Sequence, residues 1–97
     1  MKIQLKNIIR YLDAMSEVVI WQCDVYKGGP QENDPEKIFE GTIFEIPWYM
    51  TDFYLYNDEN SEAISAREWF DDNGARKAGF IISVVEDEKY GSSVNPF

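Results

Sequence analysis

The fold is decided by one stretch of the sequence, LKNIIRYLDAMSEVVIWQCDVY, which runs from Leu5 to Tyr26. Its first half has apolar residues at i, i+3, i+4 and i+7, the spacing that places side chains on one face of an amphipathic helix. These residues are Leu5, Ile8, Ile9 and Leu12. Its second half, residues 18–26, predicts a strand because β-branched and aromatic residues dominate it. We expect the helix stripe and one strand face to pack together, with each buried Leu or Ile contributing roughly 1.5–3 kcal/mol.

Glycine and proline residues divide the chain after this strand. They predict a loop over residues 27–36, because glycine permits positive φ and proline cannot donate to a ladder. Residues 37–41 then predict a returning strand that lies antiparallel to the first.

The next segment carries two helix signals that disagree. Thr42 and Glu45 have the spacing of a capping box, whereas Pro47 suits the first turn of a helix. A helix begun at Thr42 would contain Pro47 in its interior, so we favour a single helical turn over residues 47–51. Residues 53–56 follow as a short aromatic strand.

The segment from Ser61 to Asn73 predicts a second helix. Ser61 can cap it, and Gly74 stands where a glycine commonly ends a helix. Its apolar residues spread over a wide arc. The continuous apolar run at residues 78–85 predicts the last strand, which we expect to be central because it offers apolar side chains to both faces.

These elements predict an α+β domain with a mostly antiparallel four-stranded sheet, an N-terminal helix, a short helical turn and an inserted helix. The length of 97 residues suits one domain, which we place at residues 1–90, with a flexible C-terminal tail at residues 91–97. No apolar run is long enough to span a bilayer, and the N-terminus lacks the apolar segment of a secretory signal. The single cysteine fits a reducing compartment, so we expect a cytoplasmic protein.

The charge balance is the strongest feature of the composition. Eighteen acidic residues stand against nine basic ones, giving a net charge of −9. Binding to nucleic-acid phosphates is disfavoured, because such affinity comes mainly from Lys and Arg. Two interpretations remain: the charge keeps the chain in solution, or it forms an acidic surface for a basic partner.

The residues needed for common catalytic and metal sites are missing. The sequence has no histidine, so imidazole bases and histidine ligands are excluded. Cys23 lies among apolar strand positions and is predicted to be a core thiol. Residues 58–62 alternate oxygen ligands as a calcium loop does, but the glycine and the distal glutamate of such a loop are absent. We therefore expect no enzyme activity, no cofactor and no metal.

Aromatic and acidic residues supply the candidate contact surfaces. Seven aromatic residues crowd the stretch from Phe39 to Tyr56, and an aromatic patch is typical either of a second small core or of a protein interface. A helix over residues 61–73 would also place Glu68, Asp71 and Asp72 on one acidic ridge. The candidate partner-binding residues are Trp48, Tyr49, Tyr54, Tyr56, Glu68, Trp69, Asp71 and Asp72.

Three segments resemble a family. Residues 5–13 (LKNIIRYLD), 18–20 (VVI) and 40–47 (EGTIFEIP) are similar to the LIKYLD…VVI…GTVxDIP pattern of small proteins from Clostridia-type phages and integrative elements. The similarity covers the first half and the last strand, and residues 58–77 depart from it as an insertion would. The resemblance implies a mobile-element origin and supplies no catalytic residue.

Together these observations predict a small acidic protein with an interaction or regulatory role and a protein partner. A basic partner and a homodimer are both open alternatives, whereas direct nucleic-acid and membrane binding are not expected. The alternative function is an inhibitor that mimics nucleic acid, in which the acidic ridge would occupy the site of a basic host protein.

Overall fold

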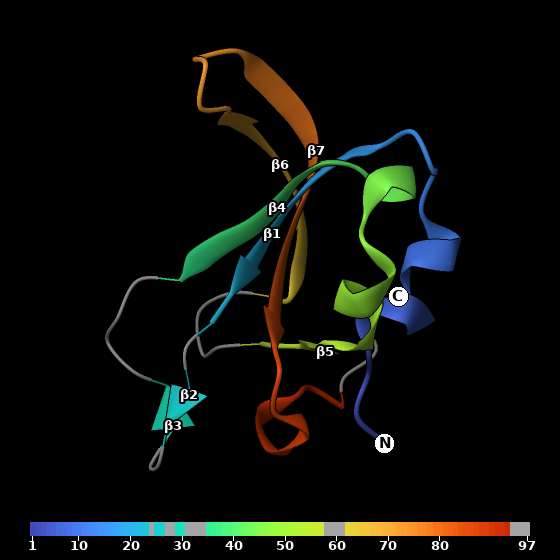
Figure 1. The fold of residues 1–97 in the computed structure, drawn as a ribbon, viewed down its shortest axis with the longest axis vertical. Coiled ribbons are helices and arrows are strands. Elements are labelled where there is room, and N and C mark those ends of the chain that lie inside the picture. Colours follow the sequence, from blue (N-terminus) through green and yellow to red (C-terminus); the bar gives the residue numbers. More distant parts are fainter. Residues whose placement is uncertain (24, 27–28, 31–34, 58–61, 94–97) are drawn as a thin grey trace.

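The computed structural model of the chain describes residues 1–23, 25–26, 29–30, 35–57 and 62–93. It is an α+β fold in which a mixed five-stranded sheet carries short 3₁₀ turns on one side (Figure 1). The predicted class and the mostly antiparallel sheet are confirmed, but the sheet has five strands where the sequence predicted four.

Strands β1 (Glu17–Gln22) and β7 (Arg76–Val85) form the centre of the sheet. β1 pairs with β4 (Glu36–Thr42) in the predicted antiparallel sense and with β7 in parallel. The far side of β7 is shared by β5 (Tyr54–Leu55) and β6 (Ile64–Phe70). The prediction that the last strand is central is therefore confirmed. The apolar run of β7 places side chains on both faces of the sheet.

The predicted helix over residues 61–73 is wrong. Ser61 lies outside the described residues, and β6 (Ile64–Phe70) is a strand that pairs with β7 along its whole length. The wide arc of apolar residues has a simple cause, because a strand sends alternate side chains to opposite faces. Ile64 packs in the main core, whereas Trp69 lies on the other face of the sheet.

A tight turn joins β6 to β7. Asp71 and Ala75 face each other, with the Asp71 N–H donating to the Ala75 carbonyl at 2.9 Å. Gly74 has a φ of +79°, as the last residue of a three-residue hairpin loop requires. The residue that suggested the end of a helix therefore closes a hairpin, since both uses need the same backbone conformation.

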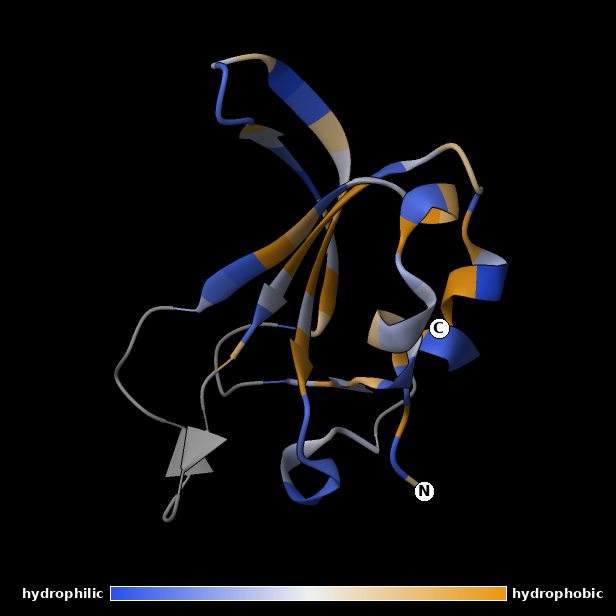
Figure 2. Cartoon of the chain, in the orientation of Figure 1, coloured by the Kyte–Doolittle hydropathy of each residue, from blue (hydrophilic) through white to orange (hydrophobic). Residues whose placement is uncertain are grey.

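The N-terminal helix consists of two successive 3₁₀ turns, η1 (Leu5–Asn7) and η2 (Ile9–Tyr11). Leu5 and Ile8 are buried against the sheet as the apolar spacing predicts. They join the core that the turns form with the strands (Figure 2). Its described core members are Leu5, Ile8, Val18, Ile20, Ile43, Leu55, Ala63, Ile64, Ile82 and Val84.

The sequence favoured a single helical turn over residues 47–51, whereas the structure has two separate turns in this segment. Thr42 and Glu45 form the capping box of η3 (Ile43–Glu45). The chain then leaves the helical conformation at Ile46, and Pro47 stands at the N-cap of η4 (Trp48–Asp52). Each signal therefore marks a turn of its own, and Pro47 interrupts neither of them.

The remaining segments lie outside the five-stranded sheet, and two of them form a separate two-stranded sheet. The predicted strand over residues 18–26 stops at Gln22, and β2 (Val25–Tyr26) pairs instead with β3 (Gly29–Pro30). Most of the predicted loop, residues 27–28 and 31–34, lies outside the described residues. A last turn, η5, covers Glu88–Tyr90. Of the predicted tail, residue 92 accepts from the Ile3 N–H and donates to the Leu55 carbonyl, and residues 94–97 lie outside the described part.

Candidate functional site

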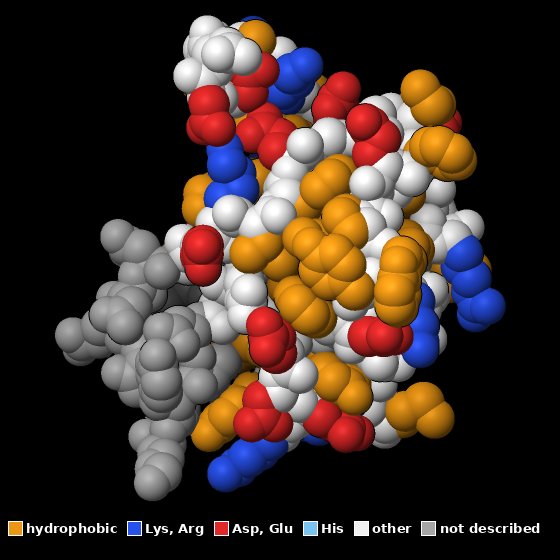
Figure 3. All heavy atoms as spheres, viewed as in Figure 1, with side chains coloured by type: hydrophobic (Ala, Val, Ile, Leu, Met, Phe, Trp, Pro, Cys, Tyr) orange, Lys and Arg blue, Asp and Glu red, His pale blue; other side chains and the backbone are white. Residues whose placement is uncertain are grey.

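Three large aromatic side chains project from the turns η3 and η4. Phe44 is 80% exposed, Trp48 79% and Tyr49 54%. We call these three residues the aromatic face. Figure 3 shows hydrophobic side chains gathered over β4 and these turns, with acidic side chains around them.

The exposure of the aromatic face follows from the period of the turns. A 3₁₀ turn has three residues per turn, so side chains at i and i+3 share one side. Ile43 is buried and Ile46 packs on the core in η3, and Met50 and Phe53 do the same in and after η4. The intervening aromatic residues are left on the outer side, where no core position is available to them.

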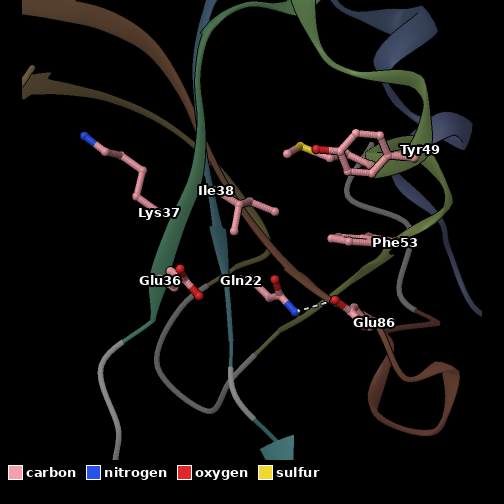
Figure 4. A pocket seen from close by; sticks show the side chains of 8 residues that line it. Gln22, Glu36, Lys37, Ile38, Tyr49, Phe53 and Glu86 are labelled. Carbon is pink, nitrogen blue, oxygen red and sulfur yellow. Dashed lines mark hydrogen bonds between the residues drawn. The ribbon is translucent and has the colours of Figure 1, made fainter.

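A groove of about 440 Å³ lies between η4 and the ends of β1 and β4. Figure 4 shows Ile38 on one side of it, facing Tyr49 and Phe53 on the other. The Gln22 amide Nε2 donates to Glu86 Oε1 at 3.0 Å across the lower end. The described lining residues are Gln22, Glu36, Lys37, Ile38, Tyr49, Met50, Phe53 and Glu86.

The groove has apolar and aromatic surface from Ile38, Tyr49 and Phe53, and it is acidic at one end. Glu36 and Glu86 supply two exposed carboxylates. Lys37 is the one basic residue among the described lining residues, and its side chain points away from the groove (Figure 4). Its ammonium group lies 2.8 Å from Asp72 Oδ1 and 2.9 Å from Glu40 Oε1, and these hydrogen bonds raise its pKa above the usual value.

Several predicted aromatic site residues lie elsewhere. Tyr56 is only 8% exposed and belongs to the interior. Tyr54 is half-buried in β5, where its Cβ approaches Gly91. Trp69 is half-buried on the other face of the sheet, and its Nε1 donates to Glu40 Oε2 at 2.9 Å. Of the predicted aromatic residues, only Trp48 and Tyr49 belong to the aromatic face.

The predicted acidic ridge is absent, because the helix that would have formed it is a strand and a turn. Glu68 forms an ion pair with Arg76 on the neighbouring strand. Asp71 accepts from the backbone N–H groups of Asn73 and Ala75 at 2.9 and 2.8 Å, which holds the turn closed. Asp72 pairs with Lys37. The three carboxylates thus serve three separate local contacts.

Sequence reasoning missed Phe44, Ile38 and Glu86. Phe44 was part of the recognised aromatic cluster, and the period of three between Ile43 and Ile46 could have placed it outside. Ile38 and Glu86 lie 48 positions apart in the sequence, and local spacing carries no signal that two such distant segments meet.

The groove offers apolar, aromatic and carboxylate surface to a ligand. Among the residues that the structure describes, no group of three or more Cys, Asp or Glu side chains could hold a metal ion. No helix in the described part is long and apolar enough to cross a membrane. Comparisons with protein-family models, with curated proteins and with solved structures found no match. The resemblance to phage and integrative-element proteins therefore stays a prediction.

Proposed function

We propose that this chain is a small acidic protein-interaction module that binds a protein partner through the aromatic face. The observation that supports this is the exposure of Phe44, Trp48 and Tyr49, each more than half exposed on the successive turns η3 and η4, with Tyr49 also lining the groove. Single exposed apolar residues are ordinary, but clustered aromatic side chains with a polar rim are typical of binding surfaces.

A regulatory, non-catalytic role in a phage or integrative element belongs to the same proposal. It is supported by the resemblance of residues 5–13 and 40–47 and by the lack of histidine in the sequence. A cytoplasmic location is part of it as well, because one cysteine fits a reducing compartment.

The proposal is tested by a comparison of two variants in a pull-down. Phe44→Ala/Trp48→Ala removes two-thirds of the aromatic face. Phe70→Ala is the matched control, because Phe70 is also an aromatic residue that is 72% exposed but lies at the end of β6. We expect wild type and Phe70→Ala to retain the same identified protein, and the double variant to lose it. Binding of that protein, purified, is then measured by calorimetry.

Two outcomes would overturn the proposal. One is retention of the same proteins by all three baits, and the other is loss of a partner by Phe70→Ala and the double variant alike. Light scattering of the three proteins in ~0.15 M salt, where the Debye length is about 8 Å, measures self-association through the same face. A dimer that only the double variant loses would identify the partner as a second copy.

A further inference from the structure

The walls and the lower end of the groove would bind different parts of a ligand. Ile38, Tyr49 and Phe53 provide apolar and aromatic surface along its length. Glu36 and Glu86 place carboxylates at its lower end, and the single lysine of the lining points away. A ligand that matches both parts needs an apolar stem with a cationic end.

We propose that the groove binds an arginine side chain from a basic segment of the partner protein. This inference rests on the proposed function and specifies the partner that the aromatic face would hold. The methylene stem of arginine packs on apolar surface, its guanidinium stacks on aromatic rings, and its planar donors match a carboxylate. Lysine shares the stem and the charge but offers no planar pair of donors.

Glu86 is already oriented for this role. The Gln22 amide donates to its Oε1 at 3.0 Å and holds the carboxylate at the end of the groove. Its Oε2 then remains available to accept from a guanidinium. Because Gln22 is the last residue of β1, the carboxylate is positioned by a strand of the central sheet.

Charge complementarity favours a basic partner over a second copy of this chain. Two copies would each bring a net charge of −9 to the contact, and like charges oppose association. Addition of a partner strand to β4 is also disfavoured. The register of β4 against β1 shifts at Ile38, and charged Lys37 and Glu40 flank it, features that protect the edge of a sheet from pairing.

The test is a titration of the labelled full chain with a blocked peptide, followed in ¹H–¹⁵N spectra. The probe is Ac-Ala-Leu-Arg-Leu-Ala-NH₂, and its control carries citrulline, which has the same shape without the charge. We expect shifts at the amides of Ile38, Tyr49, Phe53 and Glu86, and about tenfold weaker binding of the citrulline peptide, as for the loss of a charge-assisted hydrogen bond.

Two charge-matched variants locate the contact. Glu36→Gln/Glu86→Gln removes both groove carboxylates, and we expect about tenfold weaker binding of the arginine peptide. Glu62→Gln/Glu88→Gln removes the same charge from exposed positions outside the groove, and we expect a change of less than about twofold. The dispersion of each free spectrum shows that the variant is folded.

Four results would each overturn arginine recognition. They are equal binding of the two peptides, equal loss of peptide binding in the two variants, no binding at millimolar peptide, and chemical-shift changes at amides outside the groove. None of these results would contradict the proposed function, because that function depends on Phe44 and Trp48. A partner could be lost by the Phe44→Ala/Trp48→Ala variant and still bind the variant that lacks the groove carboxylates. That result would support the interaction module and contradict the arginine site.

Discussion

At the scale of single residues, Gly79 of β7 lies against the backbone of β1 with no room for a side chain. A Cβ added to it would lie 2.0 Å from the Glu17 carbonyl oxygen, so one strand of the parallel pair would have to move. We expect Gly79→Ala to lower the free energy of unfolding by about 2 kcal/mol, measured by urea denaturation. Gly74→Ala is the comparison, because open space surrounds Gly74 and only its φ of +79° penalises a side chain, at about 1 kcal/mol. A smaller loss for Gly79→Ala than for Gly74→Ala would contradict this account.

The capping box at η3 makes a pH-dependent contribution. The Thr42 hydroxyl at 2.8 Å, and then the Thr42 N–H at 3.2 Å, donate to Glu45 Oε1 and hold the Glu45 pKa below its usual 4.5. A lowered pKa in the folded state stabilises the fold above pH 4.5, and the effect is lost as pH falls through the folded value. A double-mutant cycle of Thr42→Val and Glu45→Gln, measured by thermal unfolding, should show favourable coupling at pH 7 that shrinks at pH 3. Coupling of the same size at both pH values would rule out this origin.

Single residues in the sequence predicted local backbone geometry well, but they led to a helix being predicted where the structure has β6. Thr42, Glu45 and Pro47 each mark a turn that the structure contains. Gly74 does adopt positive φ, but that conformation ends helices and closes hairpins alike. Two of the three residues of the aromatic face, Trp48 and Tyr49, were predicted. The sequence showed that aromatic residues are dense in this segment, but it did not show which of them face outward.

At the scale of elements, β6 shows why the sequence favoured the wrong structure. Residues 64–70 contain Ala, Arg and Glu, which are good helix formers, and their two-residue alternation is weak. Pairing with β7 overrides this preference, since the ladder spans seven residue pairs from Ile64 to Phe70. That pairing depends on the partner strand, which a local reading of residues 61–73 does not contain.

The Asp71 carboxylate holds this hairpin in place. It accepts two backbone N–H groups of the turn, and hydrogen bonds to a charged group contribute about 1.5 kcal/mol. We expect Asp71→Ala to lower the free energy of unfolding by about that amount, measured by urea denaturation. Asp72→Ala is the matched control, because the Asp72 side chain is mostly exposed and its ion pair with Lys37 is a surface contact worth well under about 1 kcal/mol. Equal losses for the two variants would show that the turn does not depend on Asp71.

At the scale of the whole molecule, the contacts that shape the surface join distant segments. Trp69 of β6 reaches Glu40 of β4, and Lys37 of β4 reaches Asp72 in the hairpin turn. β1 and β7 lie between these strands in the sheet, so the sheet must curl for the side chains to meet. The groove between β4 and η4 depends on the same three-dimensional arrangement. Residue spacing could predict neither these long-range contacts nor the groove.

The net charge of −9 should act on stability and on binding with opposite signs. Salt screens repulsion within the folded chain, so raising NaCl from about 0.05 to about 0.5 M, which shortens the Debye length from over 10 Å to below 8 Å, should raise the melting temperature. The same screening should weaken binding of the arginine peptide at Glu36 and Glu86, because exposed carboxylates attract a cation less strongly at high salt. Thermal scans and peptide titrations on the same samples measure the two trends. Binding that keeps its strength while the melting temperature rises would show that apolar contact, and not charge, selects the ligand of the groove.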